Sequence, residues 1–179
     1  VKQDKNCEAY GVDLDPEPIK MGMERHFSKL DKSQQKRMEY LQKNVMTVKT
    51  PPVDVVCAFN FSYFIFKSRK QILQYFKAVR KSVKKQGVFF LDIFAGPESQ
   101  KLITDVKKMK GLTYYWECQH FNPFTHECTF AIHFKDAKGV KHNNVFIYNW
   151  RFWTMPEIRD LLIEAGFSKT VVYWEGDGD

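Results

Sequence analysis

The segment Ala-Tyr-Gly-Val-Asp-Leu-Asp-Pro, from Ala9 to Pro16, decides the fold class of this 179-residue chain. Its apolar run ends at Asp13, and a stretch compatible with a helix follows directly. In nucleotide-binding α/β folds, an acid at the carboxyl end of the second strand accepts hydrogen bonds from ribose hydroxyls. A carboxylate suits this role because it only accepts hydrogen bonds and takes two hydroxyl donors together. The segment therefore predicts a strand with a candidate ribose-binding acid at its end.

Two further apolar runs predict more strands of the same kind. Val53 to Asn60 and Gly87 to Phe94 are short and continuous, which is typical of buried parallel strands. Ser68 to Lys85, between them, has a helical pattern. Strands that alternate with helices predict an α/β fold with a parallel sheet and helices on both faces.

The block from Trp150 to Phe167 predicts a helix with a signal at each end. Thr154 and Glu157 have the spacing of a capping box, and Gly166 stands where a left-handed C-terminal residue is favoured. The apolar residues at helical spacing form a stripe expected to be buried: Ile158, Leu161, Leu162 and Ala165.

In this order the segments resemble a class I S-adenosylmethionine-dependent methyltransferase, from Cys7 to Trp174. The matching blocks are Gly11 to Pro18, Pro52 to Asn60, Gly87 to Phe94 and Trp150 to Phe167. The last block is similar to a bacterial subgroup of generic, small-molecule-type enzymes. The resemblance implies one domain over residues 1–179 with a Rossmann-like sheet flanked by helices. It also implies S-adenosyl-L-methionine as cofactor and methyl transfer to a small-molecule acceptor.

The resemblance assigns roles to two groups of residues. Asp13, followed by Leu14, matches the ribose-binding acid. Asn44 and Val45 stand where the family has an acid and an apolar residue beside the adenine, and an amide oxygen still accepts from the adenine amino group. The end of the fourth strand, which faces the methionine part and the transferred methyl, matches Phe59, Asn60 and Phe61.

The chain departs from the family at both ends. The glycine-rich loop after the first strand has no counterpart, since the only Gly-x-Gly is Gly176 to Gly178. The family's last strand would begin beyond Asp179. We therefore expect the chain to be part of a longer protein and to bind the cofactor poorly by itself. Unpaired strand edges in such a part would favour self-association into a homo-oligomer.

An aromatic-rich segment from Leu112 to Trp153 predicts an antiparallel layer inserted after the fifth strand. Its strands are expected at Tyr114 to Phe121, Glu127 to Lys135 and Asn143 to Phe152, with a turn at Asp136 to Gly139. Such a layer over the carboxyl ends of the parallel strands would cover the active site and exclude water.

Candidate acceptor-binding residues are Tyr63, Phe64, His120, Tyr148, Arg151 and Trp153. Tyr148 and Trp153 have a structural alternative, which is to fill the core. Arg151 could bind a substrate carboxylate bidentately, or it could join the layer to a neighbouring acid. If the acceptor has to lose a proton, His120 is the candidate base, because imidazole titrates near neutrality. The sequence does not identify the acceptor atom.

Cys118, His120, His126 and Cys128 have residue types that bind zinc. If the hairpin turns around Pro123, Cys118 opposes Cys128 and His120 opposes His126. The tight Cys-x-x-Cys spacing of structural zinc sites is absent, so we expect neither a metal nor a disulfide here, but ordinary packing.

The net charge of +7 raises the question of nucleic-acid binding. Eight of the basic residues lie on or beside the predicted helix from Ser68: Lys67, Arg69, Lys70, Lys77, Arg80, Lys81, Lys84 and Lys85. They face away from an apolar side made of Ile72, Leu73, Phe76, Val79 and Val83. This is typical of a solvated helix face, so an RNA methyltransferase is not favoured.

The remaining features favour a cytoplasmic protein. No apolar run reaches the ~18 residues of a membrane span. The four cysteines lack the dense spacing of a disulfide scaffold and predict reduced thiols. The acidic tail Glu175 to Asp179 is expected to be a loop.

Two other classes stay open. A nicotinamide-dependent oxidoreductase would also carry an acid after its second strand, although the Trp150 to Phe167 block favours the methyltransferase. A catalytically inactive scaffold with the same fold is consistent with Asn44 and with the absent glycine-rich loop.

Overall fold

The computed structural model describes residues 1–174, so the acidic tail Glu175 to Asp179 and the Gly176 to Gly178 sequence lie outside the described residues. The chain forms two compact units. The first comprises Val1–Val56 and Lys77–Val88, and the second comprises Cys57–Phe76 and Phe89–Asp179.

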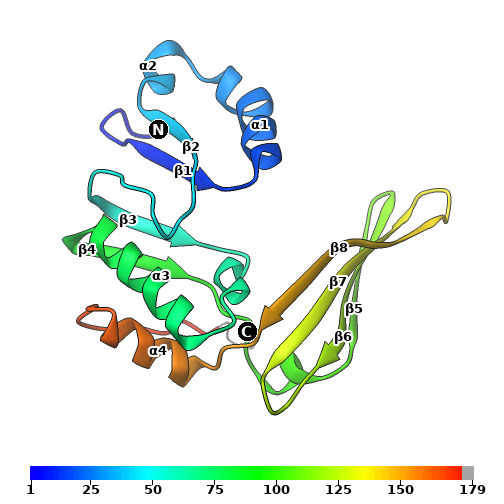
Figure 1. Ribbon diagram of the computed structural model, residues 1–179. Coiled ribbons are helices and arrows are strands. Elements are labelled where there is room, and N and C mark those ends of the chain that lie inside the picture. Colours follow the sequence, from blue (N-terminus) through cyan, green and yellow to red (C-terminus); the bar gives the residue numbers. More distant parts are fainter. Residues whose placement is uncertain (175–179) are drawn as a thin grey trace. The chain divides into compact units, whose positions relative to one another are not determined.

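In the first unit, β1 (Ala9–Asp13) pairs in parallel with β2 (Met38–Gln42), and Asp13 lies opposite Gln42 (Figure 1). Asp15 begins the following helix because its carboxylate accepts the Glu17 N–H at 2.9 Å. The predicted order of strand, acid and helix is therefore confirmed. The connecting elements are α1 (Pro16–Arg25), η1 (Phe27–Lys29) and α2 (Lys32–Gln35).

The next strands are β3 (Val53–Ala58) and β4 (Val83–Leu91), which pair with each other and are joined through α3 (Arg69–Ser82). Both strands and the helix were predicted, but the expected boundary between helix and strand was wrong. The helix ends at Ser82, and Val83 to Gln86 already belong to β4. Val83 is β-branched and Lys84 forms a cross-strand ion pair with Asp54, and both features favour a strand.

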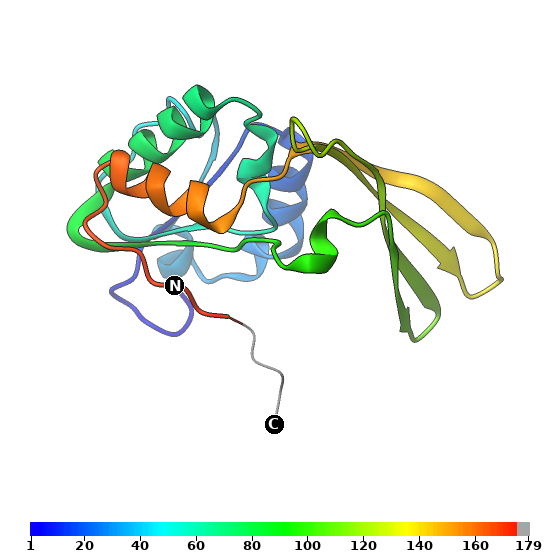
Figure 2. The same ribbon diagram turned by 90° about the horizontal axis from the view of Figure 1, so that it is seen from below.

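The buried side of α3 contains Ile72, Phe76 and Val79, as the sequence predicted. In the second unit, the start of α3 lies beside α4, and Arg69 pairs with Glu164 (Figure 2). Lys67 pairs with Glu127 at 3.4 Å. With the Lys84 pair, three of the eight basic residues near this helix are thus bound to acids, which does not favour a surface dedicated to phosphates.

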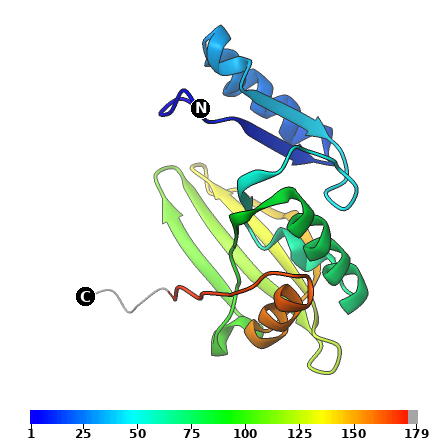
Figure 3. The same ribbon diagram turned by 90° about the vertical axis from the view of Figure 1, so that its left-hand side faces the viewer.

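The second unit contains a four-stranded antiparallel sheet in the order β5-β6-β7-β8 (Figure 3). Three of its strands were predicted. The edge strand β5 was missed because its sequence, Thr-Asp-Val-Lys-Lys-Met, has the lysines and full exposure typical of an edge. The bounds are β5 (Thr104–Met109), β6 (Leu112–Phe121), β7 (Glu127–Asp136) and β8 (Lys141–Arg151). Two short 3₁₀ helices precede the sheet: η2 (Ser62–Ile65) and η3 (Pro97–Gln100).

Helix α4 (Met155–Glu164) begins and ends as predicted. Glu157 accepts hydrogen bonds from the N–H and the hydroxyl of Thr154, both at 2.8 Å, and Thr154 accepts the Glu157 N–H. Gly166 has a φ of 101°. The stripe of Ile158, Leu161, Leu162 and Ala165 is buried.

Within the described residues 1–174, no helix is both long enough and apolar enough to cross a membrane.

The capping box gives a first prediction, for the stability of the second unit. Thr154→Ala removes the hydroxyl that caps α4, and we expect it to lower the free energy of unfolding by about 1 kcal/mol. Tryptophan fluorescence during urea unfolding measures this, because Trp116, Trp150, Trp153 and Trp174 all belong to the second unit. Thr104→Ala is the control, since Thr104 is exposed and its hydroxyl forms no hydrogen bond in the described chain. Equal midpoints for the two variants would contradict the prediction.

Candidate functional site

In the first unit, Asp13 and Asn44 lie at the same end of the β1–β2 pair. The Lys43 N–H donates to the Asp13 carbonyl at 2.9 Å, which places Asn44 one residue from this contact. Asp13 Oδ1 accepts the Asp15 N–H at 3.0 Å, whereas Oδ2 has no hydrogen bond among residues 1–174. The amide oxygen of Asn44 accepts the Met46 N–H at 2.8 Å. Asp13 thus keeps one carboxylate oxygen for a ligand, and Asn44 keeps only the second lone pair of its amide oxygen.

Apolar side chains are exposed next to both polar residues. Leu14 is 64% exposed and Val45 is 36% exposed. Each follows directly after one of the two residues that the sequence assigned to ribose and adenine. This end of the β1–β2 pair therefore offers both hydrogen-bonding groups and apolar surface.

In the second unit, the chain leaves β3 through an unusual turn. Phe59 is 54% exposed, and the next two residues, Asn60 and Phe61, have left-handed φ angles of 58° and 52°. For residues with a side chain, this conformation costs roughly 1–2 kcal/mol each. Two such residues in succession need a compensating interaction.

Asp92, just beyond the end of β4, supplies that interaction. Its Oδ2 accepts the Asn60 N–H at 2.8 Å, and its Oδ1 accepts the Phe61 N–H at 3.0 Å. Hydrogen bonds to a charged group contribute about 1.5–3 kcal/mol each, so two of them offset the cost of the left-handed pair. The Tyr63 hydroxyl donates to the Asp92 carbonyl at 2.7 Å. Three hydrogen bonds therefore join the turn after β3 to the end of β4.

The turn also places aromatic rings. The Phe61 ring lies 5.8 Å from Phe94 and 6.3 Å from Trp150, measured between ring centroids. Tyr63 and Phe64 are buried and pack edge to face. Burial, and secondarily the Asp92 carboxylate, raises the pKa of the Tyr63 hydroxyl. Tyr63 therefore stays protonated and acts as a hydrogen-bond donor.

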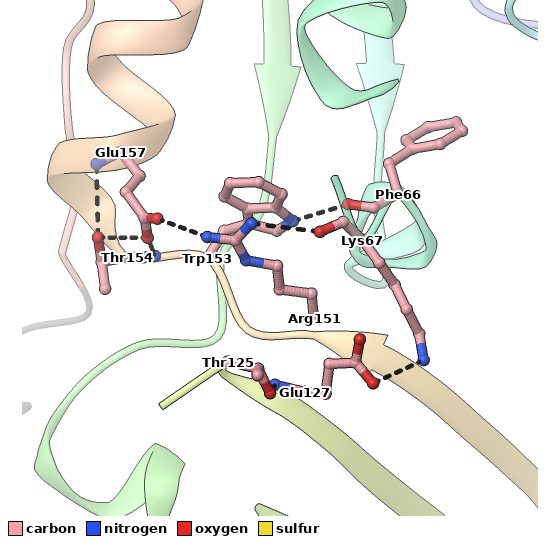
Figure 4. Close-up of polar contacts among 8 residues, drawn as sticks. All are labelled: Phe66, Lys67, Thr125, Glu127, Arg151, Trp153, Thr154 and Glu157. Carbon is pink, nitrogen blue, oxygen red and sulfur yellow. Dashed lines mark hydrogen bonds and ion pairs between the residues drawn. The ribbon is translucent and has the colours of Figure 1, made fainter. Parts of the chain in front are cut away.

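Arg151 joins three segments of the second unit (Figure 4). Its guanidinium donates to the Lys67 carbonyl at 3.2 Å and to Glu157 at 3.1 Å, and its Cζ lies 3.9 Å from the centre of a Trp153 ring. Trp153 is 1% exposed and donates to the Phe66 carbonyl at 3.1 Å. Of the two roles considered for Arg151, this geometry corresponds to the tie to a neighbouring acid. For Trp153 it corresponds to core packing.

The other two acceptor candidates lie on the antiparallel sheet. Tyr148 of β8 is half-buried, with its ring 4.7 Å from Trp150 and 5.7 Å from Trp116. Burial raises the pKa of its hydroxyl, which has no hydrogen-bond partner in the described part of the chain. His120 of β6 is exposed and lies where the pairing with β7 shifts register. The structure therefore keeps both side chains accessible.

The strand pairing expected for a hairpin that turns around Pro123, with Cys118 opposite Cys128, was wrong. Cys118 lies opposite Phe130, and Cys128 lies opposite Phe121. A bulge after Cys118 shifts the register, and Asn122 accepts the N–H groups of the next turn, so that His126 falls outside the strands. Among the described residues, no three His, Cys, Asp or Glu side chains are grouped to hold a metal, and all four cysteines are free.

One surface hollow lies elsewhere. It is lined by residues of the first unit near the amino ends of β1 and β2: Val1, Lys2, Gln3, His26, Phe27, Lys29, Leu30 and Met38. In open α/β sheets, ligands bind outside the carboxyl ends of the strands, so this hollow is not the candidate site.

The sequence assigned no role to Asp92. The predicted strand, Gly87 to Phe94, includes Asp92, whereas β4 ends at Leu91, so the position of this acid directly after a strand is visible only in the structure. Its partners are backbone N–H groups about thirty positions earlier in the chain, which no local pattern reveals.

Comparison with solved structures identifies the fold as that of S-adenosylmethionine-dependent methyltransferases. The chain matches such an enzyme from Clostridium acetobutylicum with a TM-score of 0.68 at 18% identity, over 88% of this chain and 63% of that one. The CcbJ methyltransferase from Streptomyces caelestis matches with a TM-score of 0.69 at 15% identity, over 89% of this chain and 63% of that one. An amino pentose methyltransferase from Micromonospora echinaspora, solved with bound S-adenosylmethionine, matches with a TM-score of 0.65 at 14% identity, over 89% of this chain and 65% of that one.

The chain thus spans less than two thirds of the length of these structures. No protein-family model matches the chain, and no curated protein matches it.

The cysteines provide a prediction that is independent of any ligand. Burial raises the pKa of the Cys128 thiol to about 12 and raises that of Cys118, whereas Cys7 and Cys57 are exposed. Because the thiolate is the reactive form, we expect two thiols to react rapidly with a disulfide reagent in the native protein at pH 8. Two more should react after unfolding in guanidinium. Rapid reaction of Cys118 or Cys128 in the native protein, identified by mass spectrometry, would contradict the burial.

Proposed function

We propose that this chain belongs to an enzyme that transfers a methyl group from S-adenosyl-L-methionine to a small-molecule acceptor. The observation that carries the proposal is the methyltransferase fold together with Asp13, whose free carboxylate oxygen lies at the carboxyl end of β1. A carboxylate at this position accepts hydrogen bonds from ribose hydroxyls.

The first unit is proposed to bind the adenosine part of the donor. Asp13 would accept from the ribose, and Asn44 would accept from the adenine amino group with the remaining lone pair of its amide oxygen. Leu14 and Val45 would cover the apolar faces of the nucleoside, and their present exposure supports this role.

The second unit is proposed to bind the methionine part. Phe59 and Asn60 are exposed just beyond the end of β3, and the side-chain amide of Asn60 has no hydrogen-bond partner among residues 1–174. The Phe61 ring would lie beside the sulfonium, whose positive charge is attracted to an aromatic face. The cofactor carries the reactivity, and these residues align it for in-line displacement at the methyl carbon.

The acceptor is proposed to bind on the aromatic side of the antiparallel layer. Tyr148 is the preferred contact, because its ring is half-buried and its hydroxyl is unpaired within the described chain. Tyr63, Phe64, Arg151 and Trp153 would support this surface from the core rather than touch the acceptor, since they are buried or already bonded. His120 remains the proposed base.

An amine is the acceptor that fits best. Both oxygens of Asp92 are occupied by N–H groups, so this carboxylate is not a free base. An amine attacks through its neutral form without needing a strong base, and the similar amino pentose methyltransferase acts on an amino sugar. The cytoplasm is the proposed compartment, since the four thiols are free.

An inactive scaffold is the second candidate. The amide oxygen of Asn44 already accepts the Met46 N–H, so the adenine contact is weaker than that of a free acid.

Calorimetric titration with S-adenosylhomocysteine separates the two candidates. In the full-length protein we expect micromolar binding, and Asp13→Ala should weaken it at least tenfold, because hydrogen bonds to a carboxylate contribute about 1.5–3 kcal/mol. Asp54→Ala is the matched control, since Asp54 is an exposed acid in β3. We expect its affinity to stay within twofold of the wild type. Absence of binding by the wild-type protein would favour the scaffold.

A further inference from the structure

We propose that Asp92 is a positioning residue for the methyl donor, because its carboxylate fixes the backbone of Asn60 and Phe61 in the conformation that binds the methionine part. This inference rests on the proposed function.

The hydrogen bonds of Asp92 support this role. Each carboxylate oxygen takes one N–H of two consecutive residues, at 2.8 and 3.0 Å. Both residues have left-handed φ angles, although neither is a glycine. Without an acceptor for these two N–H groups, the turn would relax toward the ordinary regions of φ and ψ. The carboxylate therefore determines the direction in which residues 60 and 61 project.

Because Asp92 binds the backbone of residues 60 and 61, the side chains of these two residues stay available to contact a ligand. The backbone N–H groups point to Asp92, while the Asn60 side chain is exposed and has no hydrogen-bond partner among the described residues. The Phe61 ring is held against Phe94 and Trp150. Asp92 thus places one amide and one aromatic ring without being a ligand contact itself.

The Tyr63 hydroxyl strengthens the same arrangement. It donates to the Asp92 carbonyl at 2.7 Å, so the acid is held by its backbone as well as by its carboxylate. Because both carboxylate oxygens are occupied, Asp92 is not a general base. If Asp92 positions the turn, the isosteric substitution Asp92→Asn should weaken ligand binding, whereas loss of a general base would leave ligand binding unchanged.

The test compares Asp92→Ala and Asp92→Asn in the full-length protein. We expect Asp92→Ala to weaken binding of S-adenosylhomocysteine at least tenfold, and Asp92→Asn, which keeps one acceptor oxygen, to weaken it less. Affinity for 5′-methylthioadenosine, which lacks the amino acid end, should stay within twofold of the wild type. Equal loss for both ligands would overturn the positioning role, since it would mean that Asp92 acts on general stability.

Thr154→Ala is the control for stability. It lies in the same unit and should lower stability without changing either affinity. If Asp92→Ala binds S-adenosylhomocysteine within twofold of the wild type, the proposal is wrong.

Amide hydrogen exchange tests the same hydrogen bonds without a ligand. The Asn60 and Phe61 amides should be protected in the wild type and should exchange at least tenfold faster in Asp92→Ala. If the wild type leaves S-adenosylhomocysteine unbound, the proposed function fails and with it the donor-positioning role. Unprotected amides in a wild type that does bind would overturn the Asp92 role alone.

Discussion

The stacking of the Arg151 guanidinium on Trp153 is the interaction on which the second unit depends. The same guanidinium binds the Lys67 carbonyl after η2 and the Glu157 carboxylate in the first turn of α4. Because the guanidinium is planar with donors in fixed directions, it holds three segments in one geometry, which a lysine would not do. The end of β8, the start of α3 and the start of α4 are thereby joined.

This junction has a consequence for the candidate site. The exit from η2 is held by Arg151 and Trp153, and its entry is held by Asp92 through Asn60 and Phe61. The left-handed turn is therefore fixed from both sides. Such a turn is costly in isolation, and it persists because the surrounding contacts determine it. Strained backbone conformations of this kind cluster at sites that bind a ligand in one fixed geometry.

Local signals in the sequence were sufficient for part of the fold. The capping box of Thr154 and Glu157, the glycine at 166 and the strand ending at Asp13 each depend on neighbouring residues, and each was predicted. The β5 strand was missed because edge strands carry the charged residues of loops. The hairpin register was wrong because a bulge shifts pairing without a distinctive residue.

The candidate site was predictable to the same extent. Asp13 was predicted because it ends an apolar run, which is β1 in the structure. Asn44 was placed only by the family resemblance, and the strand before it, β2, was not predicted. Whether Arg151 would bind a substrate or Glu157 depended on which segments pack together. The role of Asp92 also depends on contacts between residues about thirty positions apart. A single sequence does not reveal such pairs of contacting residues, because each residue could contact many others elsewhere in the chain.

The most direct test of the account is a backbone NMR titration of the full-length protein with S-adenosylhomocysteine. We expect saturable shifts at the backbone amides that follow β1 and β2, around Asp13 and Asn44, and at those of Asn60 and Phe61. Shifts confined to the hollow lined by His26, Phe27 and Met38, or no shifts at millimolar ligand, would contradict the proposal that this chain binds the methyl donor.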